Sequence, residues 1–287
     1  MVKSSLLSLL LGLLATVKGQ DFQVINFHSE FERAHFDDTS NSLARLLMAD
    51  ATTRHHDYIA FHDELNTYLK GLQSKQSKFK RKKDFISHVF YKTHRKYLKR
   101  YTPHTSLVTL SKTGRYDCLS ATSLYSYLFS TLSISHKIIE TNYHIYIVID
   151  TEEGKILLES TDPIYGFVDD KDEIQSRLDD MDLKESKAND SYTFAATVKE
   201  EISPVQLIGL QYYNAAVKAF NDQQYEVSID LLAKGIIFRS NSRTMEFALV
   251  IAQGIMQNES LNQKTKISHV NKLQRILQSG SAVVASR

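Results

Sequence analysis

The chain has 287 residues, of which 42% are hydrophobic and 24% charged, and these ordinary globular values exclude a disordered or collagen-like protein. A chain of this length favours roughly two domains. Only 3 Pro and 10 Gly are present, which argues against long flexible linkers. The net charge of +2 is too small to indicate a nucleic-acid-binding protein, so we expect no nucleic-acid partner.

The N-terminus has the pattern of a secretory signal peptide over residues 1–19. Lys3 supplies a positive charge, an apolar run follows from Leu6 to Val17, and small residues stand near its end. We expect cleavage after Gly19, with Ala15 as the second choice. The apolar run is shorter than the roughly 20 residues of a membrane-spanning helix, which disfavours a membrane anchor. The sequence therefore predicts export to the periplasm or secretion, with no transmembrane segment after cleavage.

Residues 20–101 are predicted to be helical. Apolar residues recur at helical spacing in three segments, Ser42–Ala51, His55–Gln73 and Phe85–Tyr101. Between Lys78 and Arg100 the chain has ten Lys or Arg and one acid, Asp84, a local charge of +9. We interpret this basic stretch as the solvated face of amphipathic helices. A surface for an anionic partner, such as a membrane headgroup or an acidic polymer, is the alternative.

Residues 102–200 show a change of pattern and predict an α+β fold. Thr102-Pro103 ends the preceding helix, and Cys118–Leu132 returns to helical spacing. A helical segment at Lys171–Leu178 and one more strand at Tyr192–Thr197 are also expected. The remaining runs are rich in β-forming residues, and the Glu153-Gly154 turn joins the last two of them into a hairpin. These runs are Lys137–Glu140, His144–Asp150 and Lys155–Glu159.

Cys118 is the only cysteine and is our candidate nucleophile. It stands at the predicted first turn of a helix, where unpaired N–H groups and the helix dipole favour a thiolate. The same N–H groups can stabilise a developing oxyanion. Asp117 immediately precedes Cys118, and we expect it to cap the helix rather than face the sulfur. The alternative is that Cys118 is a small buried side chain with no chemical role.

A thiolate nucleophile needs a histidine within hydrogen-bond reach, and that histidine needs an acceptor to orient it. His144 opens one predicted strand and Asp162 follows the next strand along the chain. A tight hairpin between these strands can bring His144 and Asp162 side by side. The sequence therefore predicts a catalytic triad of Cys118, His144 and Asp162. The alternative is an inert core in which His144 is a satisfied strand residue and Asp162 caps a turn.

The segments around these three residues resemble the transglutaminase-like superfamily of cysteine enzymes. The resemblance rests on Gly114–Leu124, Tyr143–Val148 and Leu158–Pro163, and covers about residues 107–167. In that family the nucleophilic Cys begins a central helix packed on an antiparallel sheet, and the His and Asp lie on adjacent strands. The resemblance implies Cys118 as nucleophile, His144 as base and Asp162 as orienting acid. The Trp that often follows the family's Cys is replaced by Leu119.

Residues 203–287 are predicted to be helical, beginning with Ser203 as N-cap and Pro204 at the first helical position. The segment 211–235 resembles one tetratricopeptide-type helical hairpin, with small residues at Ala216, Ser228 and Gly235 where two helices would approach closely. We expect these helices to brace the catalytic core. A peptide-binding groove for a protein partner is the alternative.

The combined pattern predicts an exported cysteine enzyme that acts on an amide bond of a protein or peptide substrate, by hydrolysis or acyl transfer. The tandem arrangement resembles exported bacterial envelope proteins. No cofactor is implied, and no metal is expected because adjacent His55 and His56 point to different faces and no spaced carboxylate joins them and His62. The alternative function is a catalytically inactive envelope scaffold that holds a protein or cell-wall partner.

Overall fold

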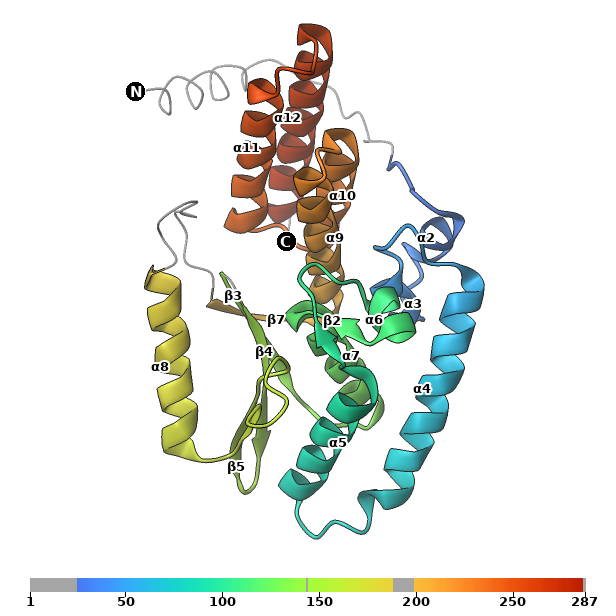
Figure 1. The fold of residues 1–287 in the computed structure, drawn as a ribbon, viewed down its shortest axis with the longest axis vertical. Coiled ribbons are helices and arrows are strands. Elements are labelled where there is room, and N and C mark those ends of the chain that lie inside the picture. The colour runs from blue at the N-terminus through green and yellow to red at the C-terminus, as the bar shows by residue number, and fades with distance from the viewer. Residues whose placement is uncertain (1–24, 143, 188–198, 286–287) are drawn as a thin grey trace.

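The structure is a computed structural model that describes residues 25–142, 144–187 and 199–285 (Figure 1). The predicted signal peptide and the predicted strand at 192–197 lie outside these residues. The helices are α2 (Glu30–His35), α3 (Ser42–Leu47), α4 (His55–Gln76), α5 (Lys82–Tyr97), α6 (Leu107–Thr113), α7 (Cys118–Thr131), α8 (Lys171–Lys187), α9 (Pro204–Asn221), α10 (Tyr225–Phe238), α11 (Ser242–Gln257) and α12 (Gln263–Ala285). The strands are β1 (Arg100–Tyr101), β2 (Arg115–Tyr116), β3 (Lys137–Thr141), β4 (Ile145–Thr151), β5 (Gly154–Leu158), β6 (Phe167–Val168) and β7 (Lys199–Ile202).

The predicted α+β class is confirmed by a five-stranded antiparallel sheet in the order β6-β5-β4-β3-β7. The hairpin expected at Glu153-Gly154 is present, with Thr151 opposite Gly154 and Ile149 opposite Ile156. Strand residues alternate between the two faces of the sheet. This register therefore decides which side chains of β4 and β5 can meet.

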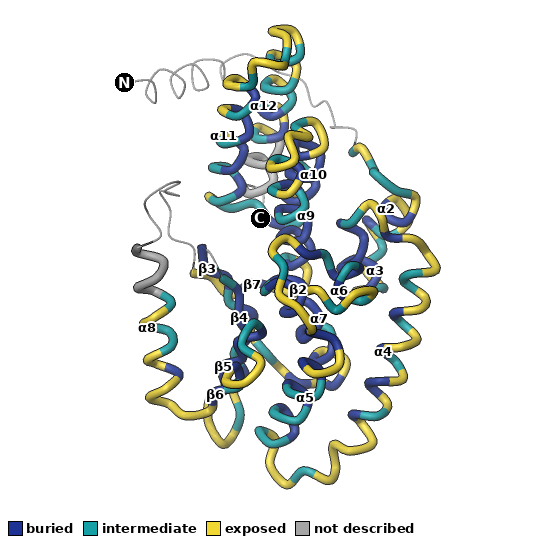
Figure 2. The backbone as a smooth tube through the Cα atoms, viewed as in Figure 1, coloured by how far each residue is buried: buried dark blue, intermediate teal, exposed yellow. Residues whose placement is uncertain are grey.

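Helices cover both faces of the sheet. One face carries Ile145, Ile147 and Ile149 of β4, which join the main hydrophobic core together with α7. The other face carries Tyr146 and Leu157, which form a second, smaller core with Val168 and Ile174 of α8. Figure 1 shows α8 on the outer side of the sheet and α7 on its inner side, and Figure 2 shows that α7 is almost wholly buried.

Several segments differ from the sequence-based prediction. The helix predicted over Phe85–Tyr101 ends at Tyr97, and Arg100–Tyr101 form strand β1 instead. Leu107–Thr113, for which no helix was predicted, form helix α6, because Ser106 caps its start and Gly114 ends it with a left-handed φ of 71°. A Cβ at Gly114 would also collide with Lys99, so the return of the chain beside β1 needs this glycine. Helix α8 continues beyond the predicted end at Leu178 to Lys187.

The main core is continuous across the three regions expected from the sequence. It contains Phe31 and Leu43 from the N-terminal helices, Leu124 from α7, and Leu207 and Ile251 from the C-terminal helices. A buried ion pair also joins the N-terminal helices to the C-terminal helices: Nζ of Lys234 in α10 lies 2.6 Å from Oε1 of Glu32 in α2. The C-terminal helices are therefore packed into the same hydrophobic core as the sheet.

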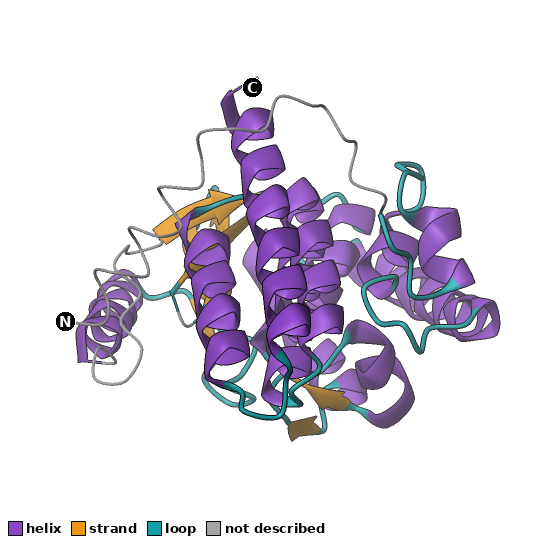
Figure 3. Ribbon diagram, turned by 90° about the horizontal axis from the view of Figure 1, so that it is seen from above, coloured by secondary structure: helices purple, strands orange, loops and turns teal. Residues whose placement is uncertain are grey.

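Helices α9 and α10 form the hairpin predicted from the small residues. Ser228 Oγ donates to the carbonyl of Ala216 at 2.8 Å, and a Cβ at Gly235 would lie 3.2 Å from the carbonyl oxygen of Gly209. Helices α11 and α12 follow beside this pair, as the view from above shows (Figure 3). No helix in the part of the chain that the structure describes is long and apolar enough to cross a membrane.

Candidate functional site

Cys118 is the first residue of α7, which confirms its predicted position at a helix start. Its side chain is half-buried. The chain reaches it through Gly114, the two residues of β2 and the N-cap Asp117. The Asp117 carboxylate accepts the N–H of Ser120 at 2.7 Å and the N–H of Thr105 at 3.0 Å. Asp117 therefore acts as the expected cap. The capping leaves the first-turn N–H groups of Cys118 and Leu119, which have no carbonyl one turn earlier, as donors beside the sulfur.

His144 lies in the turn between β3 and β4, immediately before β4 begins. Its N–H donates to Thr141 Oγ1 at 3.2 Å, and its carbonyl accepts the N–H of Thr141 at 2.8 Å. These two bonds fix the backbone of the histidine at the end of a rigid sheet. The side chain keeps 24% of its surface exposed. An incoming molecule can therefore approach the imidazole.

Glu159 is the carboxylate that meets this imidazole. Its Oε2 forms a very short contact with Nε2 of His144. Its other oxygen, Oε1, accepts the N–H of Thr161 at 3.1 Å and the hydroxyl of Thr161 at 2.7 Å. Both oxygens of the buried carboxylate are thus engaged, so its orientation toward His144 is set by the chain that follows β5.

The imidazole is held between two groups that favour its charged form. Burial alone would lower the pKa of His144, but hydrogen bonds to the Cys118 thiol and the Glu159 carboxylate, together with their negative charges, raise the pKa to about 10. Burial opposes ionisation of Glu159 too, yet the bond to His144 keeps its pKa below the ordinary value. Since Nε2 faces Glu159, the second ring nitrogen, Nδ1, is the one that remains for the sulfur.

The structure assigns Asp162 a different place from the one predicted. Its Oδ1 accepts the N–H groups of Ile164 at 3.0 Å and Tyr165 at 2.8 Å, and its Oδ2 lies 3.6 Å from Arg177. Asp162 therefore shapes the loop after β5 and does not orient His144. The three residues brought together are Cys118, His144 and Glu159. Glu159 was missed by the sequence analysis, although it is the last residue of the predicted strand Lys155–Glu159 and directly follows the observed β5.

The loop that carries Glu159 is closed by Gly166. The Gly166 carbonyl accepts the N–H of Glu159 at 2.7 Å, and its N–H donates to the carbonyl of Asp162 at 3.1 Å. A Cβ at Gly166 would stand 2.2 Å from the carbonyl oxygen of Glu159 and 2.3 Å from that of Asp162. Only glycine fits this backbone approach, so Gly166 is part of what positions the acid.

Two tyrosines of the small β1–β2 sheet border the site. Tyr116 is buried, and Tyr101 keeps 50% of its surface exposed. Their rings meet edge-on at 5.9 Å. Burial raises the pKa of Tyr101, and the negative charges of Cys118 and Asp117 raise it further. Tyr101 is therefore an exposed aromatic side chain on the small sheet that leads into the site.

Helix α9 packs against α7 and forms two hydrogen bonds with α7 and its N-cap. Asn214 donates from Nδ2 to the Asp117 carboxylate at 3.1 Å, and Gln211 donates from Nε2 to Ser123 Oγ at 2.9 Å in a buried position. These bonds reach the cap and the middle of the helix that bears Cys118. The contact supports the bracing role predicted for the C-terminal helices.

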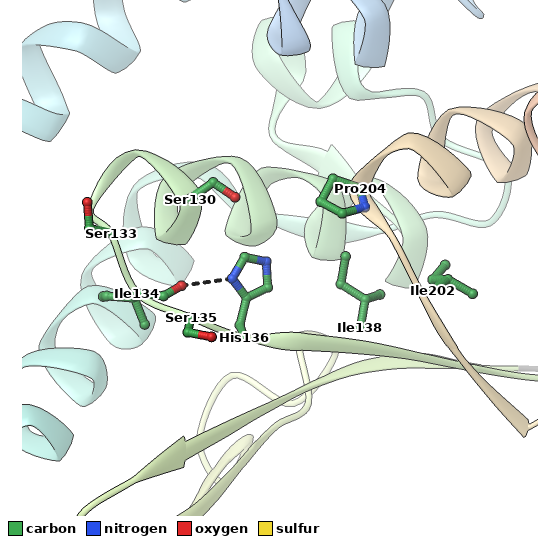
Figure 4. Close-up of a pocket in the computed structure, with 8 residues that line it drawn as sticks. All are labelled: Ser130, Ser133, Ile134, Ser135, His136, Ile138, Ile202 and Pro204. Atoms are coloured by element: carbon green, nitrogen blue, oxygen red, sulfur yellow. Dashed lines mark hydrogen bonds between the residues drawn. The ribbon is translucent and has the colours of Figure 1, made fainter.

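A separate open pocket of about 430 Å³ lies at the other end of α7 (Figure 4). His136 donates from Nδ1 to the carbonyl of Ile134 at 2.9 Å and accepts the hydroxyl of Ser126 at Nε2. Helix α7 has 14 residues, so about 20 Å separates this pocket from Cys118. The pocket is therefore not part of the cysteine site.

The search for metal sites covers the described residues only, and there no group of three or more His, Cys, Asp or Glu side chains could hold a metal ion. His55, His56 and His62 belong to α4 and stand apart from the cysteine site. Comparison with known proteins finds no matching family model, no matching curated protein and no matching solved structure. The functional argument therefore rests on the site itself.

Proposed function

We propose that the chain is an exported cysteine enzyme of the transglutaminase-like type, which cleaves or transfers an amide bond of a protein or peptide substrate. One observation carries the proposal. The imidazole of His144 is held between the thiol of Cys118, at a helix N-terminus, and the carboxylate of Glu159. A nucleophile, a proton carrier and an orienting acid in this order are the parts that acyl transfer requires.

The proposed reaction has two halves. The Cys118 thiolate attacks the substrate carbonyl, and the N–H groups of Cys118 and Leu119 bind the oxyanion that forms. Protonated His144 then gives its proton to the leaving amine, which leaves an acyl group on the sulfur. In the second half neutral His144 takes a proton from water or an acceptor amine, which attacks the thioester and restores the thiolate. Water gives hydrolysis, and an amine gives acyl transfer.

Alkylation of Cys118 by iodoacetamide at neutral pH tests the proposal. We expect fast labelling of the folded protein, because a thiolate paired with an imidazolium is far more reactive than a free thiol, which is only a few per cent ionised near pH 7. His144→Gln should slow labelling about tenfold or more. His136→Gln is the control. It removes a partly buried histidine that follows the far end of α7 and bonds to Ser126, and it should leave the labelling rate unchanged.

The alternative, an inactive envelope scaffold, gives a different result in the same experiment. A thiol without a working partner would be labelled only after unfolding, with no dependence on His144. Labelling at equal rates in the native protein and in the His144→Gln variant would reject the enzymatic proposal.

A further inference from the structure

Two arginines face each other across the small sheet beside the site. Arg100 of β1 is the register partner of Arg115 of β2, and both side chains are exposed. Like charges directly opposite each other on paired strands are destabilising. Neither guanidinium has a carboxylate partner among the residues that the structure describes. The pair is therefore an uncompensated positive charge at a fixed position.

The arginine pair lies on the small β1–β2 sheet that leads directly into Cys118. Arg115 stands three residues before Cys118, and the next register pair, Tyr101 with Tyr116, points to the opposite face of the sheet. Tyr116 directly precedes the cap Asp117 and Cys118, and its ring meets that of Tyr101 edge-on at 5.9 Å. One face of the β1–β2 sheet thus borders the nucleophile, and the other face carries the two cations.

Strand β1 is an edge strand, since it pairs only with β2 in the part of the chain that the structure describes. The N–H of Arg100 donates to the carbonyl of Gly114, and the N–H of Thr102 donates to the carbonyl of Tyr116. Backbone groups alternate along a strand, so the N–H and carbonyl of Tyr101 point away from β2, where this two-stranded sheet has no further strand. An extended peptide can add to such an edge, and its successive side chains then point to opposite faces.

We propose that Arg100 and Arg115 select acidic substrates, by binding a carboxylate side chain next to the residue that Cys118 attacks. An extended chain paired with β1 places one residue on the face of Tyr101 and Cys118, and its neighbours on the face of the arginines. Guanidinium groups bind carboxylates with two parallel hydrogen bonds. The inference rests on the proposed function, because it names the substrate class of the same site.

Binding of two matched peptides to the Cys118→Ala protein tests the selection without any chemistry. Both are fluorescein-labelled and extended, with a central Ala flanked on each side by Glu in one and by Gln in the other. We expect the Glu peptide to bind about tenfold more tightly, with an advantage that falls as salt is added. Arg100→Gln with Arg115→Gln should remove the advantage. Equal affinities in the starting protein, or an advantage that survives the double substitution, overturn the inference.

Lys80→Gln with Lys82→Gln is the matched control. It removes the same charge from exposed positions at the other end of α5, and it should preserve the advantage of the Glu peptide. In the unmodified protein the Glu peptide should also slow iodoacetamide alkylation of Cys118, and the Gln peptide at equal concentration should not. Binding without this protection would place the anion site away from the substrate and overturn the inference. Slow alkylation without any peptide would instead count against the proposed function.

Discussion

At the scale of single residues, the acid of the site is fixed by the point at which the chain turns after β5. The pairing of β5 with β4 ends at Leu158, so Glu159 is the first residue beyond it. The chain turns there, since the N–H of Asp162 donates to the carbonyl of Glu159 at 3.2 Å, and this turn takes Asp162 away from His144. The hairpin turn at Glu153-Gly154 was predicted correctly, but the turn after Glu159 was not predicted. The choice of Glu159 also needs the contacts with Thr161, which no sequence pattern indicates.

Glu159→Gln should remove the charge that holds His144 protonated. We expect alkylation of Cys118 at pH 7 to slow by about tenfold, because losing the charge-assisted bond to the imidazolium should destabilise the thiolate–imidazolium pair by about 1.4 kcal/mol. Asp162→Asn is the matched control and should leave the rate within about twofold, since that carboxylate bonds to backbone N–H groups and faces Arg177. A larger loss in Asp162→Asn than in Glu159→Gln would contradict the assignment.

The same pair predicts how stability depends on pH. The folded pKa of His144 is about 10, against 6.5 for the free group. A raised pKa contributes stability that is fully present below 6.5 and is lost as the pH rises from 6.5 to about 10. Urea unfolding of the native protein should show this loss, and the loss should be smaller in Glu159→Gln. If the free energy of unfolding fell equally with pH in both proteins over this range, Glu159 would not be what raises the pKa of His144.

At the scale of elements, most helices and strands follow from local pattern, and the exceptions have physical causes. Apolar spacing and caps located α7 and α10, and β-rich runs located β3, β4 and β5. Helix α6 was not predicted, because its seven residues offer less than two turns of periodicity. The contact of α9 with α7 depends on two side-chain amides meeting α7 and its cap, and such pairings are set by tertiary packing.

The loop from β5 to β6 should be sensitive to a single methyl group. Gly166→Ala brings a Cβ into the carbonyl oxygens of Glu159 and Asp162, so we expect about 3 kcal/mol of destabilisation and slower alkylation of Cys118. Gly71→Ala in α4 meets no atom within 4 Å and should stabilise by about 1 kcal/mol through helix propensity. Urea unfolding measures the change in the free energy of unfolding for each variant. Equal changes would show that the loop can shift to accommodate the Cβ at position 166.

At the scale of the whole molecule, buried charges connect the N-terminal helix α2 with the C-terminal helices α9 and α10. Glu32 of α2 accepts three hydrogen bonds: at Oε1 from Lys234 Nζ and Tyr212 Oη, and at Oε2 from the N–H of His28. Both charged side chains are almost fully buried. A buried pair of this kind costs more when one partner is removed than when both are replaced. The pair therefore makes the packing of α2 on α10 specific.

Lys234→Met should leave the Glu32 carboxylate buried without its cation and lower the free energy of unfolding by about 3 kcal/mol. Adding Glu32→Gln should recover at least about 1 kcal/mol, because a neutral amide needs no counter-charge and can still accept from Tyr212. Urea unfolding of the single and double variants gives the coupling energy. Losses in the free energy of unfolding that simply add would show that the two side chains do not act as a pair.

Because α2, α7 and α10 share one hydrophobic core, we expect the whole chain to unfold in one transition in each variant. A separate early transition of the C-terminal helices would show that they are not part of the unit that positions Cys118.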